Sequence, residues 1–244
     1  MLWGHWIFLP CVLAATQQQG SALISSADAL HASLSNRAIR TVVLTEGEYF
    51  LKETLTISRD VVLRAETAGT VVLNALGSRT TPRGVLAVVN GTVELEGLDI
   101  TGGDKGGGVH VAGGVVTITS CNIYRNTAVS GGGLAVTGGA VTTFFCNFFD
   151  NEALQASAQP SLVARSCCRA NSKRLDSCFQ GGGVYVSSAG GLSIFNGYIS
   201  NNVAVSSGAN LRVENTSTAV NVIVRLVTLR TLGVAFITPT SIDP

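Results

Sequence analysis

The carboxylate residues nearest to a catalytic arrangement are Glu94, Glu96, Asp99 and Asp104. Enzymes that hydrolyse glycosidic bonds place two carboxyl groups about 5–9.5 Å apart, so these four are the weak candidates for polysaccharide chemistry. Glu94 and Glu96 alternate with apolar residues, which predicts that both point outward from one strand, where they could bind Ca²⁺ or a sugar. The same alternation is typical of a solvated strand face, and we favour that interpretation.

His110 and Tyr185 are the candidate ligand-binding residues. They occupy equivalent positions in two glycine-led segments, with Ala135 at the same position in a third. A histidine and an aromatic ring on a shallow outward face could stack on a sugar ring. The alternative interpretation, incidental exposure of both side chains, has the higher prior.

The cysteines divide into two groups. Cys121 and Cys146 are predicted to face inward as two buried thiols, because parallel stacked coils give poor disulfide torsion. The core position that they share shrinks to Gly197 one repeat later, and we expect Phe145 or Phe148 to fill the space.

The second group lies in a basic stretch at residues 156–180. A disulfide from Cys178 to Cys167 or Cys168 would staple this stretch in an oxidising compartment. A zinc site is disfavoured because no histidine is near, and we expect no metal site. Since the stretch interrupts the repeat described next, it is a candidate partner-binding loop.

An internal repeat predicts the elements that position these residues. Residues 106–111 and 131–136 share a Gly-Gly-Gly-apolar pattern at an offset of 25, and residues 181–186 repeat it at an offset of 75 from the first. Each copy holds short strands with apolar residues at every second position. One copy cannot bury its apolar face alone, but stacked copies can, at about 4.8 Å per coil. The sequence therefore predicts an all-β solenoid of about seven coils.

Asn126, Asn151 and Asn202 recur in register with the core, each two residues before an alanine. Asparagine tolerates left-handed backbone and can bond turn backbone. Stacked amides can also bond one another from coil to coil. We therefore predict that these three residues form a structural ladder at one turn, the alternative being exposed turn residues.

The two ends of the chain are predicted from their composition. Residues 1–19 hold a short apolar run followed by small residues, which indicates a signal peptide. Residues 20–40 predict a cap with a short helix, carrying Leu23 on its apolar stripe and Ser25 or Ser26 at its N-cap. The solenoid is predicted over residues 41–238, with a tail at 239–244.

Composition excludes several classes of protein. Hydrophobic residues make up 46% and charged residues 13%, which excludes a disordered chain. The net charge of +1 gives no electrostatic footprint for nucleic acid, and no transmembrane helix is predicted. Two sequons, at Asn90 and Asn215, would accept glycans if the chain is secreted by a eukaryote.

The combined features resemble the pectin-lyase-like right-handed parallel β-helix superfamily. The repeats are similar to those of polymorphic outer-membrane proteins, which pair a Gly-Gly-apolar element with a Phe-x-x-Asn element. Those elements stand here as Gly132-Gly133-Leu134 and Phe148-Phe149-Asp150-Asn151. The resemblance implies a surface adhesin or displayed passenger, while other members of the superfamily cleave acidic polysaccharides.

The leading hypothesis is a non-catalytic extracellular or surface β-helix domain for adhesion, structure or glycan contact. Its partner would be a polysaccharide or another cell-surface molecule, with no cofactor and no nucleic acid. One alternative is a polysaccharide lyase or glycoside hydrolase, with Ca²⁺ required only for a lyase. Another is a fragment of a larger surface repeat protein.

Overall fold

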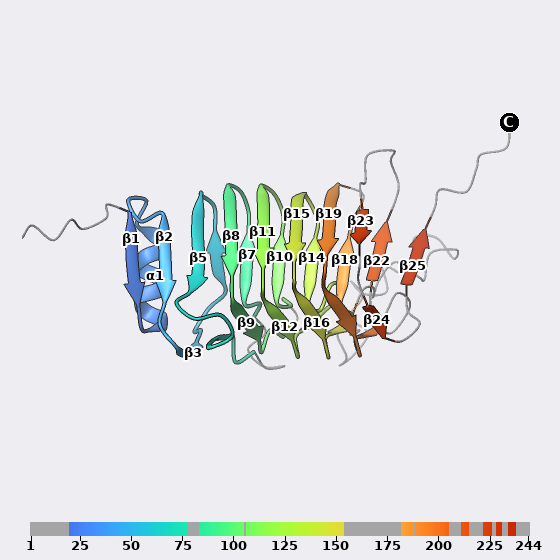
Figure 1. The fold of residues 1–244 in the computed structure, drawn as a ribbon, viewed down its shortest axis with the longest axis horizontal. Helices are drawn as coiled ribbons and strands as arrows, with labels where there is room; N and C mark the ends of the chain where they lie inside the picture. Colours follow the sequence, from blue (N-terminus) through green and yellow to red (C-terminus); the bar gives the residue numbers. More distant parts are fainter. Residues whose placement is uncertain are drawn as a thin grey trace, which may run out of the picture.

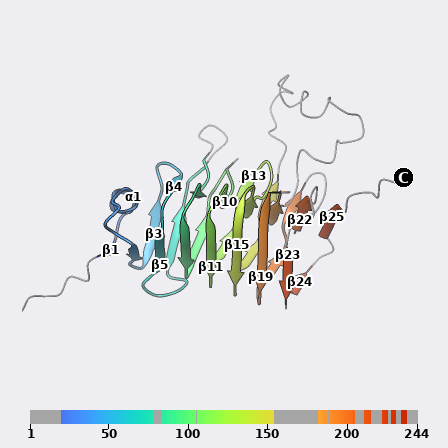
Figure 2. The same ribbon diagram turned by 90° about the horizontal axis from the view of Figure 1, so that it is seen from above.

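The computed structural model shows a rod of short strands stacked from β1 to β25 (Figure 1). The parts of the chain that it describes are residues 20–77, 83–104, 106–153, 182–187, 189–204, 211–214, 222–225, 228–230 and 234–237. Seen from above, the strands lie side by side along the rod in sequence order, from blue to red, with α1 at the N-terminal end (Figure 2). Every strand pairing is parallel, so the chain rises along the rod one coil at a time.

Three long sheets, A to C, run along the rod, and a short sheet D of three strands accompanies them over part of it. Sheet A has the order β1 (Ser21–Ile24), β2 (Thr41–Leu44), β5 (Val61–Ala65), β8 (Thr92–Glu96), β11 (Val115–Thr119), β15 (Gly139–Phe144), β19 (Gly190–Phe195) and β23 (Val222–Arg225). Sheet B has β3 (Gly47–Phe50), β6 (Val71–Asn74), β9 (Leu98–Thr101), β12 (Asn122–Tyr124), β16 (Asn147–Phe149), β20 (Tyr198–Ser200) and β24 (Thr228–Arg230). Sheet C has β4 (Leu55–Ile57), β7 (Leu86–Val88), β10 (Val109–Val111), β14 (Leu134–Val136), β18 (Val184–Val186), β22 (Leu211–Glu214) and β25 (Val234–Ile237). Sheet D has β13 (Thr127–Ala128), β17 (Glu152–Ala153) and β21 (Val203–Ala204).

Each coil contributes one strand to sheets A, B and C in turn, and the 7-stranded sheets B and C define seven coils. This confirms the predicted solenoid and its coil number. β14 pairs directly with β18, matching Leu134 to Val184. The interruption at residues 156–180 therefore inserts no strand between these two neighbours in sheet C, and the repeat continues in register after it.

Alternation of apolar and polar residues places the core inside the coils. The core column Leu98, Cys121 and Cys146 is fully buried, and both cysteines are free thiols, as predicted. The column ends at Gly197, where an added Cβ would collide with the backbone oxygen of Cys146. The prediction that Phe148 fills the core is confirmed, since it is fully buried.

Phe145 was the wrong alternative, because its side chain is 58% exposed. It sits at a corner where the backbone has φ 55°, and this conformation turns its side chain away from the core. The equivalent corner residues on neighbouring coils are Gly97, Ser120 and Asn196, with φ of 68°, 53° and 52°. One corner shape is thus repeated along the rod by residues of quite different type.

A second left-handed column lies beside the asparagine ladder. Arg125, Asp150 and Asn201 have φ of 52°, 54° and 54°. Each immediately precedes a ladder asparagine. The ladder asparagines tolerate this conformation but do not adopt it: the residue before each one turns the corner, and the asparagine side chain itself is buried.

The helix α1 (Ala27–Ser35) stands at the N-terminal end of the rod. Of the two predicted N-caps, Ser26 is the one used: its side chain accepts a hydrogen bond from the Ala29 amide at 3.3 Å. Leu23 was wrongly placed on the helical stripe, since it lies in β1 and is 64% exposed. Pairing with β2 draws residues 21–24 into sheet A.

Arg59 forms hydrogen bonds at the C-terminal end of the helix. Its guanidinium donates hydrogen bonds to the carbonyl oxygens of Ser33 at 3.0 Å, Leu34 at 2.9 Å and Ile39 at 2.7 Å. The last helical turn has no basic residue of its own. Arg59, in the turn between β4 and β5, therefore supplies the positive charge that stabilises a helix C-terminus.

Within the described residues, no helix is both long enough and apolar enough to cross a membrane.

Candidate functional site

The four candidate carboxylates lie on different parts of the rod. Glu94 and Glu96 are exposed on β8 of sheet A, whereas Asp99 is half-buried on β9 of sheet B. Asp104 follows β9 and forms an isolated backbone bridge with Arg83. The described residues contain no group of three or more histidine, cysteine or acidic side chains arranged to hold a metal ion. The four residues therefore do not form one cluster: Glu94 and Glu96 share the outward face of β8, whereas Asp99 stands on a strand of another sheet and Asp104 follows that strand. Ca²⁺ remains a prediction tied to the lyase alternative.

His110 and Tyr185 share one outward column of sheet C, with Ala135 between them. The His110 ring lies 2.9 Å from Thr137 Oγ1, measured from Nε2. Burial lowers the pKa of His110, so the neutral ring is favoured there. Because Ala135 is the neighbour of both, the two side chains occupy alternate coils, and their role in binding stays a prediction.

The ladder asparagines are buried and bonded to one another. Asn126 Nδ2 donates to Asn151 Oδ1 at 3.2 Å, and Asn151 Nδ2 donates to Asn202 Oδ1 at 3.1 Å. The same two oxygens accept the backbone N–H groups of Asn126 at 3.1 Å and Asn151 at 2.9 Å. This ladder holds the corner between sheets B and D, and it has no face open to a ligand.

Several predictions fall outside the described residues. These are the disulfide from Cys178 to Cys167 or Cys168, the partner-binding loop at 156–180, the sequon at Asn215 and the leader at 1–19. The sequon at Asn90 is described: the side chain is exposed between β7 and β8, and its Oδ1 accepts the Gly91 amide at 2.8 Å.

The outward face of sheet B carries a second, half-buried polar ladder, which we call the amide strip: Asp99, Asn122 and Asn147. Asn122 Nδ2 donates to Asp99 Oδ1 at 2.8 Å, and Asn147 Nδ2 donates to Asn122 Oδ1 at 2.8 Å. The three residues follow the register of β9, β12 and β16. Unlike the buried ladder, this strip keeps part of its hydrogen-bonding capacity for solvent or a ligand.

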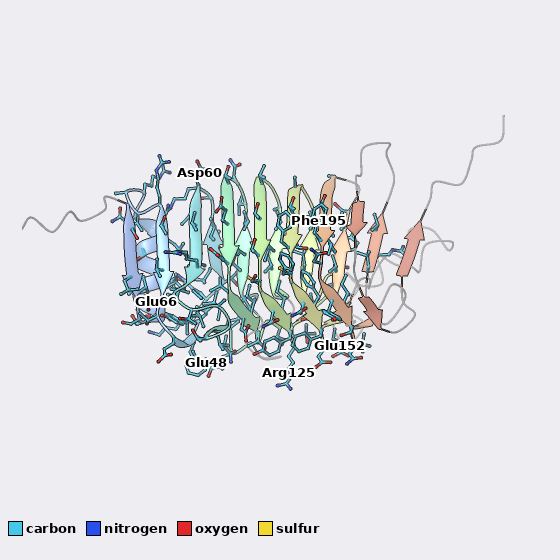
Figure 3. All side chains as sticks on the ribbon, in the orientation of Figure 1. Glu48, Asp60, Glu66, Arg125, Glu152 and Phe195 are labelled. Carbon is cyan, nitrogen blue, oxygen red and sulfur yellow. The ribbon has the colours of Figure 1, made fainter. Side chains whose placement is uncertain are left out.

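Aromatic rings stand beside the amide strip. Tyr124 and Phe149 stack with ring centroids 5.0 Å apart and an interplanar angle of 6°. They lie two residues along the strand from Asn122 and Asn147, on the same face of sheet B. The Arg125 guanidinium lies 5.9 Å from the centre of the Tyr124 ring and projects away from the rod (Figure 3).

Arg125 and Asp150 occupy equivalent repeat positions on adjacent coils, where opposite charges could form an ion pair, but no ion pair joins these two described residues. Both are left-handed corner residues, with φ of 52° and 54°. The guanidinium is drawn instead to the face of the neighbouring ring, which attracts cations.

A second aromatic pair lies across the corner, at the end of sheet A. Phe144 and Phe195 stack at 5.1 Å with an interplanar angle of 13°. Phe145 and Tyr198 nearby are 58% and 49% exposed. Phe144, Phe145, Phe195 and Tyr198 thus gather at the corner between sheets A and B, whereas Tyr124 and Phe149 stand at the other end of their sheet B strands.

Electrostatics distinguish Asp99 from the other candidate carboxylates. Burial raises the pKa of Asp99, and the hydrogen bond from Asn122 opposes that change. Asp99 also lies on the same sheet as the aromatic pair. It is therefore the one predicted acidic residue that belongs to this candidate site.

Sequence reasoning missed both aromatic pairs. The offset of 25 residues that aligns the asparagines also aligns Tyr124 with Phe149, so this pair could have been found from the repeat. Phe144 and Phe195 are 51 residues apart, and they align only when the stretch at 156–180 between them is left out of the repeat alignment.

Comparison with known proteins bears on the fold. Residues 62–223 match the family described as the right handed beta helix region. The comparisons with curated proteins and with solved structures each returned no match. The narrower likeness to polymorphic outer-membrane repeats stays a prediction. The family match spans well over half of the 244 residues, and together with the parallel three-sheet coils it means that the chain belongs to the right-handed β-helix family.

Proposed function

We propose that the chain is a non-catalytic extracellular domain that binds glycan along the outside of its β-helix. The observation that carries this proposal is the amide strip running beside stacked Tyr124 and Phe149 on one face of sheet B. The apolar run at residues 6–15 and the exposed sequon at Asn90 support the extracellular setting.

The chemistry of the face suits a sugar. A pyranose ring has hydroxyl groups around its rim and C–H groups on its faces, so it needs both hydrogen-bonding and apolar partners. Side-chain amides supply donors and acceptors, and aromatic rings supply the apolar surface. Because every contributing side chain stands on a paired strand, little ordering is required when a ligand binds.

Binding to a panel of immobilised polysaccharides tests the proposal. We expect retention on at least one polymer, weakened about three- to tenfold by Tyr124→Ala, in line with the energy of one aromatic contact. Asn122→Ala should also weaken binding, because it breaks the amide strip. Phe50→Ala is the matched control, since Phe50 is an exposed aromatic on the first strand of sheet B. Folded protein that binds nothing, or variants that bind like the wild type, would contradict the proposal.

The enzyme alternative is favoured by one observation, the raised pKa of Asp99 beside the aromatic face. A carboxyl group of this kind suits a general acid. The same panel should therefore be assayed for new reducing ends, with and without Ca²⁺. Cleavage that is lost in Asp99→Asn would replace the binding proposal with an enzymatic one.

A further inference from the structure

A cavity of about 380 Å³ lies between α1 and the first strand of sheet C, far from the amide strip. Its walls come from the helix and its C-terminal end on one side and from β4 and its flanking residues on the other. Leu34 is the one apolar side chain that lines it, and polar or charged side chains form the rest. The volume lies within the usual range for ligand sites.

The wall made by β4 is the open edge of a sheet. Sheet A has 8 strands, because β1 extends it beyond β2, whereas sheet C has 7 and begins at β4. The Leu55 amide donates to Val85, and the Ile57 carbonyl accepts from Val89, so both residues bond toward β7. Residues of a parallel strand alternate in this direction, so the N–H and C=O of Thr56 point the other way, toward the cavity.

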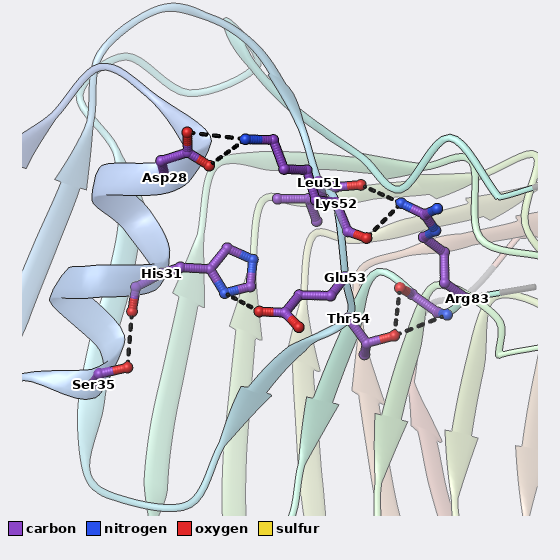
Figure 4. A network of polar contacts seen from close by, with 9 residues as sticks. Asp28, His31, Ser35, Leu51, Lys52, Glu53, Thr54 and Arg83 are labelled. Carbon is purple, nitrogen blue, oxygen red and sulfur yellow. Dashed lines mark hydrogen bonds and ion pairs between the residues drawn. The ribbon is translucent and has the colours of Figure 1, made fainter. Parts of the chain in front are cut away.

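Charge divides the cavity along the strand direction. At the C-terminal end of β4 stand Arg37 and Arg59, close enough that repulsion by Arg37 adds to desolvation in lowering the pKa of Arg59. At the N-terminal end, His31 Nδ1 lies 3.5 Å from Glu53 Oε1, and the two side chains point toward one another (Figure 4). His31 Nε2 is buried and has no hydrogen-bond partner among the described residues.

We propose that this cavity binds an extended acidic peptide segment as an eighth strand of sheet C, with its carboxylate held by Arg37. The peptide would run parallel to β4, like every other pairing of the sheet, so that its carboxylate reaches the C-terminal end of the strand. Main-chain bonds to Thr56 would supply affinity, as in other cases of strand addition. A planar guanidinium can bond both oxygens of the carboxylate.

This proposal goes beyond the glycan-binding face, because it uses a different end of the rod and a different ligand. A saccharide in the cavity would rely on the hydroxyl groups of Thr56 and Ser58. A peptide strand relies instead on the backbone of Thr56. Substitutions of Thr56 that remove either its hydroxyl group or its backbone N–H therefore distinguish a bound saccharide from a bound peptide.

The test measures binding of the acetylated hexapeptide Gly-Ser-Thr-Ser-Thr-Asp to the full chain by titration calorimetry. Thr56→Pro removes the backbone N–H, and it should preserve the fold because that N–H takes no part in the pairing with β7. We expect Thr56→Pro to weaken binding at least tenfold. Thr56→Val keeps the N–H and should bind within twofold of the wild type. Equal binding by the proline variant, or loss of binding in the valine variant, would overturn the proposal.

The charged contact has its own control. Arg37→Gln should weaken binding at least tenfold, whereas Arg40→Gln, which alters an exposed arginine outside the cavity, should leave it within twofold. Amidating the C-terminus of the peptide, or replacing its aspartate by asparagine, distinguishes a main-chain from a side-chain carboxylate. Peptide binding that survives both changes together, or that does not slow hydrogen exchange at the Thr56 amide of the wild type, rejects the proposed site.

Discussion

Two buried polar side chains of the same coil have opposite effects on stability, depending on whether they are hydrogen-bonded. Asn151 is fully buried, and both ends of its amide are paired: Nδ2 donates to the Ile123 oxygen at 2.8 Å, and Oδ1 accepts from the backbone N–H and Nδ2 of Asn126. Thr143 is also fully buried, but its hydroxyl has no partner among the described residues. An unpaired buried hydroxyl retains its desolvation penalty, whereas a paired amide recovers it.

Asn151→Ala should lower the free energy of unfolding by about 3 kcal/mol, because it leaves several buried groups on two coils without partners. Urea unfolding followed by circular dichroism measures the change. Asn147→Ala is the control, since Asn147 is half exposed and water can replace its bonds. A loss for Asn151→Ala no larger than that for Asn147→Ala would show that the buried ladder adds little to stability.

Thr143→Val should raise the free energy of unfolding by about 1 kcal/mol or more, because a methyl group replaces an unpaired buried hydroxyl of similar size. The substitution also restores the apolar character of a column in which Ile118 and Ile194 are the neighbours. Thr142→Val changes the adjacent, half-exposed threonine and should have little effect. If the variant at 143 is destabilised in the same urea titration, the hydroxyl has a role that this structure does not explain.

At the scale of elements, the strands at the ends of the solenoid have an unpaired edge that must be covered, whereas the inner strands do not. Each inner strand is paired on both sides, but the first coil must be closed by something other than a further full coil. Here β1 extends sheet A, and α1 stands beside the open edge of sheet C. Arg59 ties the end of that helix to the second coil, so one side chain links the cap to the repeat.

Arg59→Ala should destabilise the protein by about 1–2 kcal/mol, since charged hydrogen bonds to the helix carbonyls are lost while the site stays partly in water. Hydrogen exchange should accelerate in α1 more than in the inner strands. Arg59→Lys should rescue little, because one ammonium group cannot reproduce the planar arrangement of donors. Arg40→Ala, at an exposed position, serves as the control, and uniform acceleration along the chain would contradict a local capping role.

A strand could be predicted from the sequence where its own residues alternate in the β-strand pattern or where it recurs in the repeat. The strands at Thr41–Leu44 and Leu55–Ile57 carry their own β-branched pattern, and the copies after residue 106 confirm one another by register. The strand at Ser21–Ile24 has no such pattern and exists because β2 offers an edge. The cavity beside β4 was not predictable, because it depends on where the helix stands and no repeat determines that.

At the scale of the whole molecule, the rod tolerates an interruption because its pairing bypasses it. Pairing across the stretch at 156–180 continues in all four sheets: β14 with β18, β15 with β19, β16 with β20, and β17 with β21. Because the strands before and after this stretch pair directly, the core contacts between their two coils are kept.

Deleting residues 158–178 should therefore leave a folded rod with a β-rich circular dichroism spectrum and a single cooperative unfolding transition. Binding to the polysaccharide panel should persist, because the aromatic pairs lie on sheets A and B. Failure of the shortened chain to fold would mean that the inserted stretch supports the coils. Loss of binding by a folded variant would move the ligand site to the insertion, in line with its prediction as a partner loop.

The carboxylate at Asp99 also sets a direction for the whole amide strip. An ionised carboxylate only accepts hydrogen bonds, so Asn122 must present its nitrogen to Asp99 and its oxygen to Asn147. Asn147 must then donate in the same sense, which leaves its own oxygen facing the next coil. The buried ladder runs the opposite way, with each donor on the earlier coil. Asp99 thus fixes the order of donors and acceptors along the amide strip. A chain-like ligand with two different ends would bind this strip in one orientation.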